Sequence, residues 1–331
     1  MKKLLVTLIL ISLILSPSAM AQADEKLNIV AMNFAAFDFA RQIAGQMAEV
    51  NLILPPGVDA HSYEPSPKDL IAIQNADLLV YNGGIGENWI TTLLASMENK
   101  APESVAMMDV VDTVTEEMVE GMEDAPHAHG EHEEEHDHGD EHEHDDEHEH
   151  EHHEEHELDE HVWTTPKNAV KISQAIAEKL TGLDPDNRAV YEENFGTFKK
   201  QMEELDRDFR DMLASAKRHT IVLGDRFPMR YFTMEYGLEY YAAFPGCTAQ
   251  SEPSAKTIAF LMDTIRDSKI PVVFYTEFAS RKAAELIAQE TGSKPLLLHS
   301  AHNVTTQEME DGITYLSIMR NNLENLREAL N

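Results

Sequence analysis

The hydrophobic positions from Lys26 onward fall into short apolar runs separated by helical stretches. In the first part of the chain, this pattern predicts strands at 27–32, 50–54 and 77–83 and helices at 37–48, 67–76 and 88–97. A second series predicts strands at 219–224, 239–244, 271–277 and 295–300 and helices near 230–237, 253–267, 281–290 and 312–329. Such alternation is typical of α/β units with a mainly parallel sheet.

One long amphipathic stretch lies between the two series. Its apolar positions step by four and three residues and form a single stripe, made of Tyr191, Phe195, Phe198, Met202, Leu205, Phe209 and Met212. This stripe predicts one helix over 185–217. At the α-helical rise, roughly thirty residues reach ~45 Å, which is long enough to run along two domains. The expected fold is therefore α/β, with lobes at 24–184 and 218–331 joined by one long linker helix.

The first residues have the layout of a secretory signal peptide. Two lysines precede an apolar run from Leu4 to Leu15, and small residues follow with alanines spaced as in a cleavage site. The run is short for a bilayer span, so residues 1–23 are expected to be cleaved rather than to remain as an anchor. The only cysteine, Cys247, lies far from this region, so no acylated cysteine can follow the signal. We expect a periplasmic protein without an intramolecular disulfide.

Composition adds one feature that the periodicity does not show. The thirty residues 127–156 contain twelve histidines and fifteen acidic residues, and they carry −15 of the formal net charge of −34. Without larger apolar side chains, such a segment cannot fold alone, and we predict a disordered loop at 125–157. The charge argues against nucleic acid and anionic membranes as partners, and it favours cations. The histidines are expected to form weak zinc sites: His127, His129, His132, His136, His138, His142, His144, His148, His150, His152, His153 and His156.

Histidine is scarce elsewhere, and its positions are informative. His61 follows a predicted strand in a loop rich in proline, and His161 is surrounded by apolar residues after the acidic segment. His299 ends an apolar run and His302 follows three residues later, whereas His219 begins a strand and is most simply a surface residue. The ends of strands in α/β sheets are where ligands bind.

Two carboxylates also lie at the ends of predicted strands, as some of the histidines do. Asp225 and Glu277 each follow an apolar run, although either could serve only in an ion pair or a loop. Two or three neutral imidazoles with one carboxylate suit Zn²⁺, whereas Mn²⁺ prefers shells rich in carboxylates. A zinc hydrolase would need a water-activating carboxylate and a substrate pocket, which the sequence does not clearly display, and no phosphate loop or nucleophile elbow is visible. We therefore expect a binding protein rather than an enzyme.

Together these motifs resemble the periplasmic zinc-binding proteins of ABC importers, within the metal-specific group of substrate-binding proteins. GVDAHSYEPSPKDL is similar to the first ligand motif of that family, DEHVWTTPKNA to its second, and TYLSIMRNNLENLREAL to its closing helix. The likeness covers nearly the whole mature chain in the same order. It implies two lobes with the ion in the cleft between them and only modest lobe motion on binding.

The resemblance assigns His61 and His161 as ligands, but the third family motif departs from the pattern. Gly224 stands where the family usually has its histidine, in GDRFPMRYF, and His299 stands where the family usually has an aspartate. We therefore expect His299 to supply the third imidazole, with His302 as the competing choice and Asp225 or Glu277 as the carboxylate.

The expected function is capture of Zn²⁺ in the periplasm and its delivery to a membrane permease powered by a separate ATPase. The chain is expected to act as a monomer. Three alternatives remain open at this point: a receptor for manganese or another divalent metal, a metal-binding adhesin or buffer that relies on the acidic histidine segment, and a zinc hydrolase.

Overall fold

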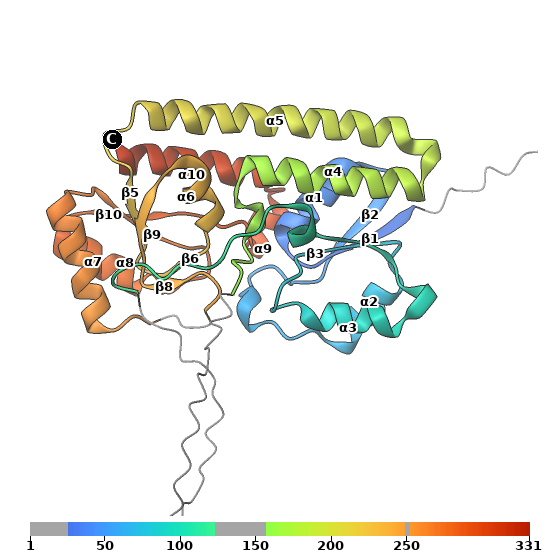
Figure 1. The fold of residues 1–331 in the computed structure, drawn as a ribbon, viewed down its shortest axis with the longest axis horizontal. Helices are drawn as coiled ribbons and strands as arrows, with labels where there is room; N and C mark the ends of the chain where they lie inside the picture. The colour runs from blue at the N-terminus through green and yellow to red at the C-terminus, as the bar shows by residue number, and fades with distance from the viewer. Residues whose placement is uncertain (1–25, 123–156, 249–251) are drawn as a thin grey trace, which may run out of the picture.

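The computed structural model describes residues 26–122, 157–248 and 252–331. They form two α/β lobes side by side beneath one long helix (Figure 1), which confirms the predicted fold class. The expected signal peptide and the histidine-rich residues 127–156 lie outside the described residues. Within the described residues, no helix combines the length and the apolar character needed to cross a membrane.

The N-terminal lobe is built on a four-stranded parallel sheet with the order β2-β1-β3-β4. Its strands are β1 (Leu27–Ala31), β2 (Ala48–Leu52), β3 (Leu78–Tyr81) and β4 (Glu103–Ala106). Its helices are α1 (Phe34–Ala44), α2 (Pro67–Gln74), α3 (Asn88–Ser96) and α4 (Pro166–Leu183). The sequence pattern missed only β4 among these strands, because ESVA has neither an apolar run nor clear alternation.

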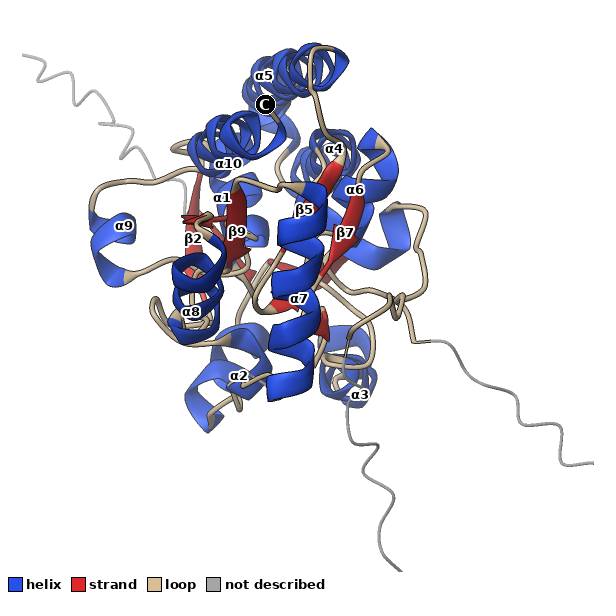
Figure 2. Ribbon diagram, turned by 90° about the vertical axis from the view of Figure 1, so that its left-hand side faces the viewer, coloured by secondary structure: helices blue, strands red, loops and turns tan. Residues whose placement is uncertain are grey.

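The C-terminal lobe repeats this topology. Its strands are β5 (Thr220–Val222), β6 (Arg226–Phe227), β7 (Glu239–Tyr241), β8 (Phe244–Pro245), β9 (Val272–Tyr275) and β10 (Lys294–Leu297). Its helices are α6 (Arg230–Tyr236), α7 (Ala255–Ser268), α8 (Lys282–Thr291), α9 (Thr306–Glu310) and α10 (Tyr315–Leu330). Parallel pairs β5-β7 and β9-β10 are joined by a bridge between Leu223 and Phe274, so the order β7-β5-β9-β10 matches that of the first lobe. Helices α7 and α8 lie outside these strands (Figure 2).

Helix α5 (Arg188–Ala214) spans both lobes (Figure 1). It packs on α1 and α4 in the first lobe and on α6 and α10 in the second. The predicted apolar stripe is buried along its length, except that Phe195 is only partly buried. The helix begins later than predicted, since Pro185–Asn187 forms a 3₁₀ turn before it.

A second connection between the lobes was not predicted. Residues 111–122 leave the first lobe and run along the second, where the backbone N–H of Cys247 donates to Glu116 over 2.7 Å and Arg230 pairs with Glu117 over 2.7 Å. The chain returns through a bridge between Thr115 and Leu158. Residues 111–122, which lead into the histidine-rich segment, therefore lie against the C-terminal lobe, although they precede α4 in the chain.

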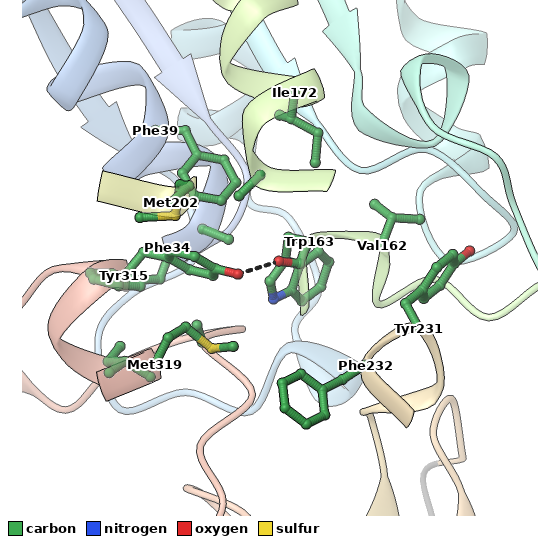
Figure 3. Packing of buried hydrophobic residues seen from close by; sticks show 14 of the residues in the cluster. Phe34, Phe39, Val162, Trp163, Ile172, Met202, Tyr231, Phe232, Tyr315 and Met319 are labelled. Carbon is green, nitrogen blue, oxygen red and sulfur yellow. Dashed lines mark hydrogen bonds between the residues drawn. The ribbon is translucent and has the colours of Figure 1, made fainter. Parts of the chain in front are cut away.

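One continuous hydrophobic core extends through both lobes. At its centre, the Tyr315 hydroxyl of α10 donates to the carbonyl of Trp163 over 2.7 Å (Figure 3). The indole N–H of Trp163 donates in turn to the carbonyl of Ser300 over 2.8 Å. These buried bonds fix the turn after His161 to the loop that follows β10.

Candidate metal centre

Three histidines from distant parts of the chain meet between the lobes. His61, His161 and His302 each offer a ring nitrogen, and these atoms all lie within 4.8 Å of one another. Their ring centroids are separated by 5.8 Å (61 to 161), 5.4 Å (61 to 302) and 5.6 Å (161 to 302). No other group of three metal-binding side chains, within the described ranges, comes together in this way.

His61 is held by a short turn after β2. It lies in the 3₁₀ turn Ala60–Ser62, and the Asp59 carboxylate caps this turn by accepting from the His61 backbone N–H over 3.0 Å. The other oxygen of Asp59 pairs with Arg226 of the C-terminal lobe over 2.7 Å. This ion pair ties the loop of His61 to the opposite lobe, and neither partner was singled out from the sequence for this role.

His161 is the most deeply buried of the three, with 1% of its surface exposed. Its Nδ1 lies 3.2 Å from the Asp159 carboxylate, which orients the ring and leaves Nε2 free to bind a metal. Gly246 makes room for the ring, since a Cβ there would lie 3.1 Å from Cε1 of His161 and 2.8 Å from a backbone oxygen.

His302 is positioned by an unusual turn after β10. Ala301 has a φ of 61°, which is rare for a residue with a side chain. Ser300 anchors the turn, because its N–H and hydroxyl both donate to Glu277, over 2.9 and 2.5 Å. The His302 ring then packs on Trp163 with a centroid distance of 4.9 Å.

The structure places His299, the expected third ligand, outside this cluster. Its Nδ1 accepts the Ala301 N–H over 3.0 Å, so that nitrogen stabilises the turn instead of facing the other histidines. The lower-ranked His302 stands in the cluster in its place. Asp225 is also outside the cluster and accepts from the Thr276 hydroxyl over 2.5 Å.

Comparison with known proteins shows the family of this chain. A family model described as "Zinc-uptake complex component A periplasmic" matches residues 29–329. This chain belongs to that family. The zinc-uptake family was the one that the sequence motifs resembled.

Two relatives illustrate the family. The "High-affinity zinc uptake system protein ZnuA" of Bacillus subtilis is 31% identical over 306 residues, covering 92% of this chain and 88% of the relative. The "Zinc-binding lipoprotein AdcA" of Streptococcus pneumoniae is also 31% identical, over 93% of this chain but only 56% of the relative. The chain thus spans little more than half the length of the AdcA relatives it matches.

Solved structures share the fold. The Zn(II)-bound ZnuA-like domain of Streptococcus pneumoniae AdcA superposes with a TM-score of 0.71 at 26% identity, covering 92% of this chain and 99% of that domain. The metal-dependent lipoprotein YcdH of Bacillus subtilis gives a TM-score of 0.72 at 27% identity, with the same coverage of both chains.

The charge states in this zinc-uptake family member suit metal binding. Burial lowers the pKa of His61 to about 3, and the positive charges of His161 and Arg226 add to this effect. Burial also lowers the pKa of His302 well below its usual value. Burial acts the same way on His161, but the negative charges of Asp159, Glu116 and Glu160 together outweigh it and raise that pKa. At neutral pH, His61 and His302 can therefore bind a metal without first losing a proton.

Two cavities adjoin the cluster, and all three histidines line both. The smaller one, about 30 Å³, is also lined by Arg226 and Glu277. It has roughly the volume of one water molecule. The larger one, about 320 Å³, is lined by Asn82, Glu87 and Glu160. Three imidazoles with an open fourth side are a donor set that fits zinc, and His161 would release its proton when the metal binds.

Proposed function

We propose that this chain captures Zn²⁺ outside the cytoplasm and delivers it to the permease of an ABC importer that a separate ATPase drives. The observation that carries the proposal is the convergence of His61, His161 and His302 between two lobes. The printed names of the relatives, a high-affinity zinc uptake protein and a zinc-binding lipoprotein, support zinc as the cargo.

In this proposal, the three imidazoles bind the ion directly and a fourth ligand completes a tetrahedral shell. Glu277 is the favoured carboxylate, because it lines the small cavity together with all three histidines. On binding the metal, the Glu277 carboxylate would give up the hydrogen bond that it accepts from the Ser300 hydroxyl. Asp225 is less favoured because it does not line either cavity beside the cluster.

The same donor set supports a binding protein rather than an enzyme, and zinc rather than manganese. Imidazole ligands favour zinc, while a manganese shell would need more carboxylates. We further propose that residues 1–23 are removed on export, that the mature chain is periplasmic and monomeric, and that residues 127–156 collect zinc weakly.

Competition calorimetry tests the choice of metal. When zinc is titrated into the manganese-equilibrated mature chain, we expect zinc to displace manganese from one tight site. The H61A variant should lose this tight phase and keep the weaker phases, because the imidazole set is then incomplete. Tighter binding of manganese than of zinc would overturn the assignment.

A further inference from the structure

The larger cavity beside the histidines contains a second set of possible ligands. Asn82, Glu87 and Glu160, here called the oxygen cluster, line this cavity together with His61, His161 and His302. All three members offer oxygen atoms, in contrast to the nitrogen donors of the histidines. Glu160 also adjoins His161 in the chain, so the two donor sets are linked by one peptide bond.

The Glu160 carboxylate rests on a glycine turn. The N–H of Gly86 donates to its Oε1 over 2.9 Å. A Cβ at Gly84 would lie 2.5 Å from the same oxygen, and Gly84 has a φ of 79° that favours glycine. The turn after β3 is therefore shaped to hold this carboxylate in the cavity.

The Glu87 carboxylate is held close by. One of its oxygens accepts the backbone N–H groups of Asn82 and Gly83, over 2.6 and 3.0 Å. Burial raises the pKa of Glu87 to about 7, and the negative charge of Glu160 adds to the rise. Both carboxylates line the same cavity, and a cation bound there would offset their negative charges.

Asn82 gives a second indication, independent of the two carboxylates, that this cavity binds a ligand. The residue is only 4% exposed, and its Nδ2 donates to the Glu160 carbonyl over 2.8 Å. Its Oδ1 has no hydrogen-bond partner within the described ranges. A buried acceptor without a partner is costly, and Asn82 lines the same cavity as the two carboxylates, so its Oδ1 is available as a third oxygen ligand. The other unpartnered polar atom in this cavity, Nδ2 of Asn33, is a donor that a metal-bound water could satisfy.

We propose that Asn82, Glu87 and Glu160 form a second, oxygen-donor site for a divalent cation, which holds zinc briefly on its way to the three histidines. The role as a staging site rests on the proposed zinc capture. Carboxylate and amide oxygens suit harder cations and hold zinc less well than imidazoles do. Zinc therefore moves from this site to the histidines through the cavity that both sets line.

Terbium luminescence tests the site itself. Tb³⁺ seeks oxygen ligands, and Trp89 lines the same cavity and can sensitise its emission. On the zinc-loaded mature chain, we expect tryptophan-sensitised emission, and we expect the E87Q/E160Q variant to lose it. Glutamine keeps an acceptor oxygen for each backbone N–H, so the fold should be retained. E49Q, which removes an exposed carboxylate from β2, should leave the emission unchanged.

Stopped-flow zinc binding tests the staging role. Trp163 packs on His161 and His302, so its fluorescence should report arrival at the histidines. We expect the association rate to fall about tenfold in E87Q/E160Q, as for loss of electrostatic guidance, while the dissociation rate stays constant. If the double variant does not bind zinc at equilibrium, E160Q alone is measured in its place.

Terbium emission that persists in the double variant, or an unchanged association rate, would overturn the proposal. These outcomes differ from a failure of the proposed function, which would appear as weak zinc binding by the wild-type chain. If the wild-type chain binds zinc weakly, the terbium experiment is run on the zinc-free chain, because the oxygen cluster does not require zinc at the histidines to bind Tb³⁺.

Discussion

The backbone around Ala301 decides which histidine joins His61 and His161 in the cluster. The positive φ of Ala301 reverses the chain, so that His302 points toward His61 and His161 while Nδ1 of His299 accepts the Ala301 N–H. Both histidines follow an apolar run in the sequence, and the family resemblance favoured His299, whereas the structure brings His302 into the cluster. The direction of a side chain that follows a strand depends on the backbone angles of the turn. An alanine in the sequence does not reveal that its φ is positive.

Alanine substitutions separate the two histidines. H302A should weaken zinc binding by at least ~100-fold, because a direct ligand contributes more than the tenfold to hundredfold that is typical of supporting residues. H299A should have a smaller effect, through loss of the acceptor for the Ala301 N–H. Competition with a chromophoric chelator measures both. A larger loss in H299A than in H302A would contradict the assignment.

The residues that orient the three histidines were harder to predict than the candidate histidines themselves. Asp59 lies two residues before His61, a spacing typical of a side chain that caps a turn, so its local role had a signal in the sequence. Its partner Arg226 is 167 residues away, and Gly246 reaches His161 only through tertiary packing. Such long-range contacts cannot be derived from one sequence.

At the scale of elements, strong periodicity was a reliable guide. The stripe in α5 and the apolar runs of β1, β3 and β9 predicted these elements within a few residues. Short elements carry too few residues for a period to be visible, which explains why β4 and α9 were missed. The path of residues 111–122 was also missed, because its contacts with the second lobe are tertiary.

The contact between α10 and the turn that carries His161 should contribute measurably to stability. Y315F removes the hydroxyl that donates to the buried Trp163 carbonyl (Figure 3). We expect the free energy of unfolding to fall by about 1–3 kcal/mol, the cost of an unsatisfied buried group. Urea unfolding of the zinc-free protein measures this change.

Y241F is the matched control for this stability measurement. The Tyr241 ring packs on Phe260, and its hydroxyl makes no hydrogen bond within the part of the chain that the structure describes. Equal stability of Y315F and the control would show that the Tyr315 bond does not hold the turn.

At the scale of the whole molecule, two lobes with the same strand order face each other across the histidines. Helix α5, residues 111–122 and the ion pair between Asp59 and Arg226 all connect the lobes. With several rigid connections, large hinge motion on zinc binding is not expected. The resemblance of the sequence motifs implied this restraint, but the number of connections became visible only in the structure.

Removal of residues 127–156 tests how the histidine-rich segment relates to the folded body. The bridge between Thr115 and Leu158 lies outside the deletion, so the fold should be retained. We expect calorimetry to show loss of weak zinc sites and retention of one tight site. Loss of nearly all binding would indicate a metal buffer, and unchanged stoichiometry would indicate a linker without a role in binding.

The central claim concerns which three nitrogens bind the ion, and a crystal structure of the zinc-loaded protein tests it most directly. Anomalous scattering at the zinc edge would locate the metal without ambiguity. We expect one zinc between the lobes, with a nitrogen each from His61, His161 and His302 at ~2.1 Å. Zinc bound by His299 in place of His302, or a density map with no zinc at the three histidines, would contradict the account.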